Sequence, residues 1–201
     1  MSEQVQTDEL GRRHLERLVM LSDGVFAIAI TLAALEIRPQ HAPGQSLAQA
    51  WLLPVLVYLV AFALVGGAWN EHRQLMARLT RIDATGILLN MLMLGSVALL
   101  PVTVREFMED PATANALIYA CTTLLTYALL SLSWAHATLA AKLAPQIDRR
   151  FAMGRLLKML AAPTMLLAII CYLLQLPWLA LLIALLAVML GGLSRRYPRT
   201  A

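Results

Sequence analysis

Charged residues are scarce in this sequence: Asp, Glu, Lys and Arg supply 14% of its 201 residues, against about 25% in soluble domains. Apolar residues make up 60% instead, and the mean hydropathy is +0.69. A soluble domain of this length has too little interior to bury so much apolar surface. The composition therefore excludes an ordinary soluble enzyme and a disordered chain, and it requires a bilayer as the apolar environment.

Patterns that carry catalysis or bind metal are also missing. The two cysteines, Cys121 and Cys171, both lie in apolar segments, which excludes a disulfide framework and a metal-ligand spacing. We expect both to be buried small apolar side chains. The sequence has no Gly-rich phosphate loop, paired-carboxylate site, His/Cys cluster or Ser-His-Asp arrangement. We therefore predict that the protein is not an enzyme and holds no metal or cofactor.

Six apolar stretches predict an all-α integral membrane protein with six transmembrane helices. Each stretch has about the 20 residues that cross the hydrocarbon core of a bilayer. The expected spans are residues 18–37, 47–69, 86–104, 114–139, 156–174 and 176–193. Gln175 and Pro177 predict a tight turn between the last two spans, because proline cannot continue a helix.

The same pattern divides the chain into three parts. We expect a polar cytoplasmic N-terminus at 1–17, with its first eleven residues disordered, a six-helix transmembrane domain at 18–193, and a basic cytoplasmic tail at 194–201. Asp23 near the start of the first span, and Glu36 and Arg38 beyond it, argue against a cleaved signal peptide.

Basic residues predict the orientation of the six spans. All 16 Lys and Arg residues except Arg38 and Arg105 lie on segments that share one side of the membrane with the N-terminus. Because cytoplasmic loops carry the excess of Lys and Arg, we expect both termini to be cytoplasmic. This placement explains the sequence pI of about 9.4 without a nucleic-acid partner.

The first span carries a polar pair, Ser22 and Asp23, about one turn inside its start. A carboxylate in a membrane helix costs roughly 2.5 kcal/mol or more at the bilayer centre, and less near the end, so it needs a partner or water. Spans two and three offer partners at the same depth: Trp69, Asn70, His72 and Asn90. We predict an interhelical hydrogen-bond network. The alternative is a proton relay through Asp23 and His72, because histidine titrates near neutral pH.

A second feature of the first span is a stripe of side chains. Ile28, Leu32 and Leu35 are spaced four and three residues apart, so they stack on one helix face, with Thr31 beside them. Such a stripe usually faces lipid or another helix. The other interpretation is a water path narrowed by apolar side chains, which stops ions by dewetting.

Residues 17–37 resemble the first helix of the transmembrane protein 175 family of potassium channels. The family motif, Arg-x-x-x-Phe-Ser-Asp, corresponds here to Arg17, Leu21, Ser22 and Asp23, followed by the run GVFAIAITL. Leu21 stands where the family has phenylalanine, so we expect the packing at that end of the helix to differ.

Later residues extend the resemblance into the next two spans. Trp69 and His72 are similar to the Trp-x-x-His ending of the family's second helix, and Asn90 and Pro101 are similar to its third-helix positions.

The resemblance implies a homotetramer in which the first helix lines a central pore for monovalent cations. Ile28 would form the apolar constriction, with Leu32 and Leu35 as further apolar layers and Thr31 as a layer associated with potassium preference. Arg17 would join the polar network, whose members are then Arg17, Ser22, Asp23, Trp69, His72 and Asn90. The implied partners are further copies of the chain, the lipid bilayer and the permeant potassium ion.

The leading hypothesis is therefore a passive, potassium-favouring cation channel with a hydrophobic gate, in the inner (plasma) membrane of the cell. A proton conductor or proton-coupled carrier that uses Asp23 and His72 is the alternative. A membrane scaffold without ion flux is a third interpretation.

Overall fold

The computed structural model of the protein describes residues 2–38, 44 and 46–197, and the only regular secondary structure in these residues is helix. The elements are α1 (Ser2–Leu35), α2 (Leu47–Met76), α3 (Ala84–Glu109), α4 (Thr113–Ala135), the short π-helix η1 (His136–Ala140), α5 (Arg149–Leu173) and α6 (Pro177–Ser194). Six helices in the described chain are long and apolar enough to cross a membrane. The predicted all-α fold with six membrane-capable helices is confirmed.

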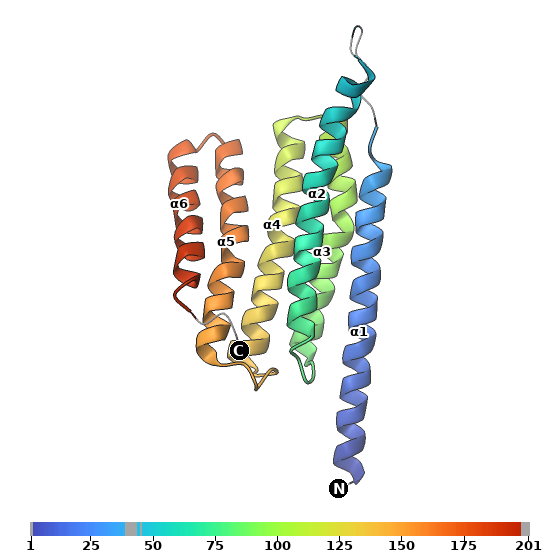
Figure 1. Ribbon diagram of the computed structural model, residues 1–201, viewed down its shortest axis with the longest axis vertical. Coiled ribbons are helices and arrows are strands. Elements are labelled where there is room, and N and C mark those ends of the chain that lie inside the picture. The colour runs from blue at the N-terminus through green and yellow to red at the C-terminus, as the bar shows by residue number, and fades with distance from the viewer. Residues whose placement is uncertain (1, 39–43, 45, 198–201) are drawn as a thin grey trace.

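The helices form a bundle with α1 at one edge and α6 at the other (Figure 1). Helix α1 packs on α2 and α3, α4 packs on α3 and α5, and α6 packs on α5. The chain runs up and down, so the α2–α3 and α4–α5 connections and the end of α6 lie at the end of the bundle from which α1 starts (Figure 1). We call this end the basic end, because its connections and helix ends carry Arg73, Arg78, Arg81, Lys142, Arg149, Arg150, Arg155, Arg195 and Arg196.

Several helices extend beyond the apolar stretches that predicted them. Helix α2 continues to Met76 rather than ending near Trp69, and α5 begins at Arg149 rather than near Leu156. Asp148 caps α5 by accepting a hydrogen bond from the backbone N–H of Arg150 at 2.9 Å. Hydropathy marks the part of a helix that crosses hydrocarbon, whereas capping residues set where the helix begins.

The expectation of a disordered N-terminus is wrong for the residues that the structure describes, because α1 already begins at Ser2. A formed helix propagates at low cost, since each added residue gains a hydrogen bond. Arg12 and Glu16 add an ion pair of 3.8 Å one turn apart. Met1, and residues 198–201 of the predicted tail, lie outside the described residues.

Apolar character does not decide which face of a helix is buried. Cys171 is buried as expected, but Cys121 is exposed, so that prediction is wrong for Cys121. Ile118 and Leu125, one turn to either side of it, are exposed as well. An exposed face of a membrane helix can be as apolar as a buried one, because lipid tails accept apolar side chains as readily as a protein core does.

Helices α4 and α5 are joined around Trp134, which is fully buried. Its indole Nε1 donates a 3.0 Å hydrogen bond to the carbonyl of Ala152. The ring of Phe151 meets it edge-on, with centroids 6.4 Å apart, and the Arg155 guanidinium lies 5.5 Å from the indole centroid. Because α6 packs on α5, Trp134 also anchors the last helical pair to the rest of the bundle.

Replacing Trp134 by alanine is expected to lower stability markedly. Truncating a fully buried aromatic side chain costs about 3–5 kcal/mol in protein cores, and here it also removes the hydrogen bond to Ala152. Thermal denaturation of the purified protein in detergent should show a clearly lower midpoint for Trp134→Ala. Trp178 on α6, which is 78% exposed, is the matched control, and Trp178→Ala should stay near the wild type. Equal midpoint shifts for the two variants would contradict this role of Trp134.

Candidate functional site

Three buried side chains near the basic end link the first three helices. The amide oxygen of Asn90 on α3 accepts a 2.8 Å hydrogen bond from His72 Nε2 on α2. The Asn90 amide nitrogen donates to Ser22 Oγ on α1 at 3.3 Å, and the Ser22 hydroxyl donates to the carbonyl of Leu18 at 2.8 Å. The bonds form one directional chain in which each donor has an acceptor, and such chains strengthen their members cooperatively.

Asp23, the neighbour of Ser22, finds a different partner. Its Oδ1 accepts a 2.8 Å hydrogen bond from the indole Nε1 of Trp69 on α2. The guanidinium of Arg73 lies 5.3 Å from the Trp69 ring centroid, so a positive charge stands over the face of the indole. We call Ser22, Asp23, Trp69, His72 and Asn90 the helix-one network. Its bonds fix both the height and the rotation of α1 against α2 and α3.

Two residues that the sequence analysis grouped with this network stand apart from it. Arg17 is exposed, and no hydrogen bond or ion pair joins its side chain to the network in the described part of the chain. Asn70 likewise makes no side-chain hydrogen bond to the network there. Asn70 is half-buried on α2.

The sequence analysis missed one member of the site. Phe26 is almost completely buried, and its ring lies 5.6 Å from the imidazole of His72, centroid to centroid. Phe26 follows Ser22 by one helical turn, so both share the buried face of α1. That spacing is the signal by which the sequence points to Phe26.

The stripe on α1 lies on the opposite side of the helix from the buried residues Ser22, Phe26, Ala29 and Ala33. Ile28 is 58% exposed, Leu32 is 45% exposed and Leu35 is 74% exposed. Thr31 is exposed beside them, and its hydroxyl contacts the carbonyls of Ala27 and Ile28 at 3.0 and 2.9 Å. We call Ile28, Thr31, Leu32 and Leu35 the exposed stripe. No part of the described chain covers it.

Asp83 and His136 make a further polar contact at the basic end. The carboxylate of Asp83 caps α3 by accepting from the N–H of Gly86 at 2.8 Å, and His136 Nε2 lies 3.0 Å from each of its oxygens. Partial burial raises the pKa of Asp83, but the hydrogen bonds from Gly86 and His136 outweigh it and leave the pKa below its ordinary value of 3.8. The α3 N-terminus therefore carries an ionised cap at neutral pH, where it complements the helix dipole.

Comparison with known proteins connects this geometry to one family. The model of the endosomal/lysosomal potassium channel TMEM175 family matches residues 17–101, the stretch that contains both the helix-one network and the exposed stripe. A potassium channel of Streptomyces collinus is 30% identical over 159 residues, which cover 70% of this chain and 77% of that protein. The chain belongs to the TMEM175 family.

Other TMEM175 relatives agree in sequence and fold. A potassium channel of Chamaesiphon minutus is 33% identical over 141 residues, which cover 65% of this chain and 69% of that protein. The endosomal/lysosomal proton channel TMEM175 of the rat is 29% identical over 57% of this chain, but the match spans 24% of that longer protein. These relatives are ion channels and not enzymes, so the prediction that the protein is not an enzyme is confirmed.

A solved structure supports the same assignment. The crystal structure of a lysosomal potassium-selective channel TMEM175 homologue from Chamaesiphon minutus superposes with a TM-score of 0.68 at 26% identity. The superposition covers 90% of this chain and 98% of that one. The likeness therefore extends over most of the chain rather than over the family motif alone.

Asn90 is expected to be the residue of the network whose loss costs most, because it joins both neighbours. Asn90→Leu keeps a similar volume but leaves His72 Nε2 without an acceptor, and an unsatisfied buried polar group costs about 1–3 kcal/mol. The thermal midpoint in detergent should fall. Thr122, whose hydroxyl bonds only to its own helix at Ile118, is the control, and Thr122→Val should change the midpoint little. An unchanged midpoint for Asn90→Leu would show that the network does not hold α1.

Proposed function

We propose that this protein is a cation channel that favours potassium, and that it works as a homotetramer with α1 lining a central pore. The observation that carries the proposal is the exposed stripe. It lies on the side of α1 opposite the buried face through which α1 contacts α2 and α3. One face of α1 is fixed to its own subunit, and the other face is free for a pore. The names of the bacterial relatives as potassium channels support the choice of ion.

Small residues beside the stripe favour close packing of several α1 helices around one axis. Gly24 and Ala27 are exposed on the same side of α1, and a Cβ atom added at Gly24 would meet no atom within 4 Å. Small residues let membrane helices approach each other closely. Four copies of α1, each with its stripe turned inward, make a narrow apolar pore.

Ile28 is the constriction of this pore, with Leu32 and Leu35 as the next layers. An apolar ring does not replace the hydration shell of an ion as carbonyl oxygens do, so it selects by the cost of dehydration. Potassium sheds water more easily than sodium, which favours moderate potassium preference and a dewetted, closed state when the ring is tight. The Thr31 oxygen adds an acceptor next to the Ile28 layer.

The basic end faces the cytoplasm in this proposal, with both termini inside and the protein in the plasma membrane. The rule that cytoplasmic loops carry the excess of Lys and Arg supports this orientation. The helix-one network then lies near the cytoplasmic mouth of the pore, and Leu35 lies toward the outer mouth.

Substituting Ile28 tests the proposal directly. Ile28→Asn should raise potassium flux several-fold and erode the preference for potassium over sodium, because a polar ring stays wet. The measurement is ion flux in liposomes containing the purified protein, first under a potassium gradient and then under a sodium gradient. Leu185 on α6 is 57% exposed, close to Ile28, so Leu185→Asn is the matched control and should leave both fluxes unchanged.

The outcome also separates channel from scaffold. If wild-type protein that is folded and inserted passes neither ion, the channel proposal fails. The protein then shares the fold of the family but not its ion conduction. If flux exists but Ile28→Asn alters neither its size nor its selectivity, Ile28 is not the constriction.

Proton conduction through Asp23 and His72 is the second candidate, which the name of the rat relative as a proton channel favours. Against a relay, no hydrogen bond joins Asp23 to His72 among the described residues, and Asp23 is bound to Trp69 instead.

Asp23→Asn distinguishes the two candidates. In the potassium channel it weakens a charge-assisted bond that positions α1, so we expect an altered assembly size in detergent and reduced thermal stability. In a proton pathway it abolishes proton flux while the assembly size stays the same. Size-exclusion chromatography and a proton-flux assay in liposomes, run on the same preparation, decide between these outcomes.

A further inference from the structure

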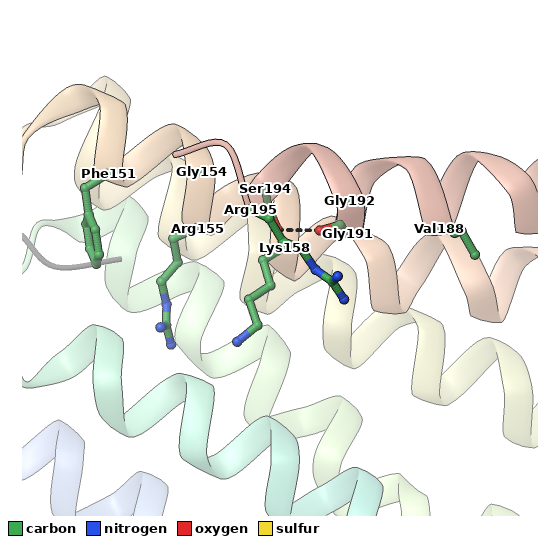
Figure 2. A pocket seen from close by; sticks show the side chains of 9 residues that line it. All are labelled: Phe151, Gly154, Arg155, Lys158, Val188, Gly191, Gly192, Ser194 and Arg195. Carbon is green, nitrogen blue, oxygen red and sulfur yellow. Dashed lines mark hydrogen bonds between the residues drawn. The ribbon is translucent and has the colours of Figure 1, made fainter. Parts of the chain in front are cut away.

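A cavity lies away from α1, at the basic end between α5 and α6. It has a volume of about 800 Å³, and its walls include Arg155 and Lys158 of α5, Val188 and Gly191 of α6, and Arg195 just after α6. Figure 2 shows these basic residues among the cavity walls, with the side chains of Arg155 and Lys158 extending in a similar direction from α5 and that of Arg195 extending from the end of α6. None of these residues belongs to the helix-one network or to the exposed stripe.

The three basic side chains of this cavity differ in whether they already have a partner within the protein. Arg155 donates to Glu71 Oε2 at 2.5 Å and to Gln74 Oε1 at 2.7 Å on α2, although its Nε is buried without a partner. Glu71 is therefore already paired. The side chains of Lys158 and Arg195 make no hydrogen bond or ion pair in the described chain. The cavity holds two positive charges that lack a counter-charge, so an anion is the ligand that fits it.

The remaining walls leave room for a bulky group. A Cβ atom added at Gly191 or Gly192 would meet no atom within 4 Å, so the α6 backbone borders open space there. The hydroxyl of Ser194 is turned onto the carbonyl of Gly191 at 2.7 Å. Val188, one turn deeper along α6, continues the cavity as an apolar surface (Figure 2). Cations at one end and an apolar wall toward the bilayer match an amphiphile rather than a free ion.

The position of the cavity relative to the apolar parts of α5 and α6 also favours an amphiphile as the ligand. Lys158 lies close to the start of the apolar part of α5, and Arg195 follows the last turn of α6. Both charges thus stand at the boundary between water and hydrocarbon, where phospholipid phosphates lie. Basic pockets between transmembrane helices on the cytoplasmic side bind anionic headgroups.

We propose that this cavity binds the phosphate headgroup of an anionic phospholipid from the leaflet at the basic end. Lys158 and Arg195 contact the phosphate, and Arg155 is held behind them by Glu71 and Gln74. The first part of an acyl chain lies along Val188 between α5 and α6. The site is separate from the pore, and its existence does not depend on which ion the protein conducts.

The test titrates fluorescently labelled phosphatidylglycerol into the full-length protein in detergent. Wild type should bind this lipid and release it to unlabelled phosphatidylglycerol but not to phosphatidylcholine. The double variant Lys158→Gln/Arg195→Gln should bind roughly 30-fold more weakly, because each basic side chain near a membrane surface contributes roughly a fivefold factor. Arg196→Gln removes an adjacent exposed charge that does not line the cavity, so it should bind as wild type does.

A second variant fills the cavity without changing charge. Gly191→Leu adds a side chain where the backbone borders open space, and leucine is the better helix former, so the protein should stay folded and lose lipid binding. Circular dichroism and size-exclusion chromatography verify folding of each variant.

Three results would overturn the proposal. The first is undiminished lipid binding in both cavity variants, and the second is an equal loss in Arg196→Gln, which indicates diffuse charge attraction. The third is displacement of the lipid by millimolar inorganic phosphate alone, which assigns the cavity to a free anion. Because ion flux is not the readout, these results are independent of the channel proposal.

Discussion

The hydrogen-bond chain from His72 through Asn90 to Ser22 is the constraint on which the position of α1 depends. The apolar residues that α1 buries further along its length, Ala29 and Ala33, are small and fit equally well over a range of rotations. Polar bonds between membrane helices are individually worth only about 0.6–2 kcal/mol, but they are directional. If α1 paired with α2 and α3 one residue out of register, the exposed stripe would be rotated by about 100° around the helix axis. These bonds therefore decide that Ile28 faces away from α2 and α3.

The bilayer explains why so much apolar surface is exposed in the described chain. Lipid competes with protein for apolar side chains on equal terms, so packing alone gives little driving force for helix association. Alongside large apolar side chains such as Met93 and Leu130, the inner contacts include hydrogen bonds such as the one between Ser96 and Thr126 at 2.9 Å. Helix α6, whose buried residues are Ala180 and Ala187, presents most of its surface outward.

Charge divides the basic end into two regions with different roles. Around α1 and the start of α3, two carboxylates have partners within the protein: Asp23 is bound to Trp69, and Asp83 is bound to His136 and the α3 N-terminus. Around α5 and α6, Glu71 neutralises Arg155, while Lys158 and Arg195 face a cavity. The first region holds the helix that we propose as pore lining, and the second presents a surface to the membrane. The two regions are joined through α2, which carries both Trp69 and Glu71.

The sequence by itself determined the class of fold, because hydropathy and the bias of Lys and Arg act on the chain segment by segment. It also pointed to Ser22, Asp23, Trp69, His72 and Asn90 as one layer, since their depth follows from their distance along each helix. The tertiary structure decided which side chains are buried and which are paired, because these depend on the rotation of each helix about its axis and on contacts between distant helices. It gave Asp23 a hydrogen bond to Trp69 and none to His72, left Arg17 outside the network, exposed Cys121, and assembled the cavity of Lys158 and Arg195. None of these follows from segment hydropathy, because the mean hydropathy of a segment is the same whichever way its helix is rotated and whichever helices it contacts.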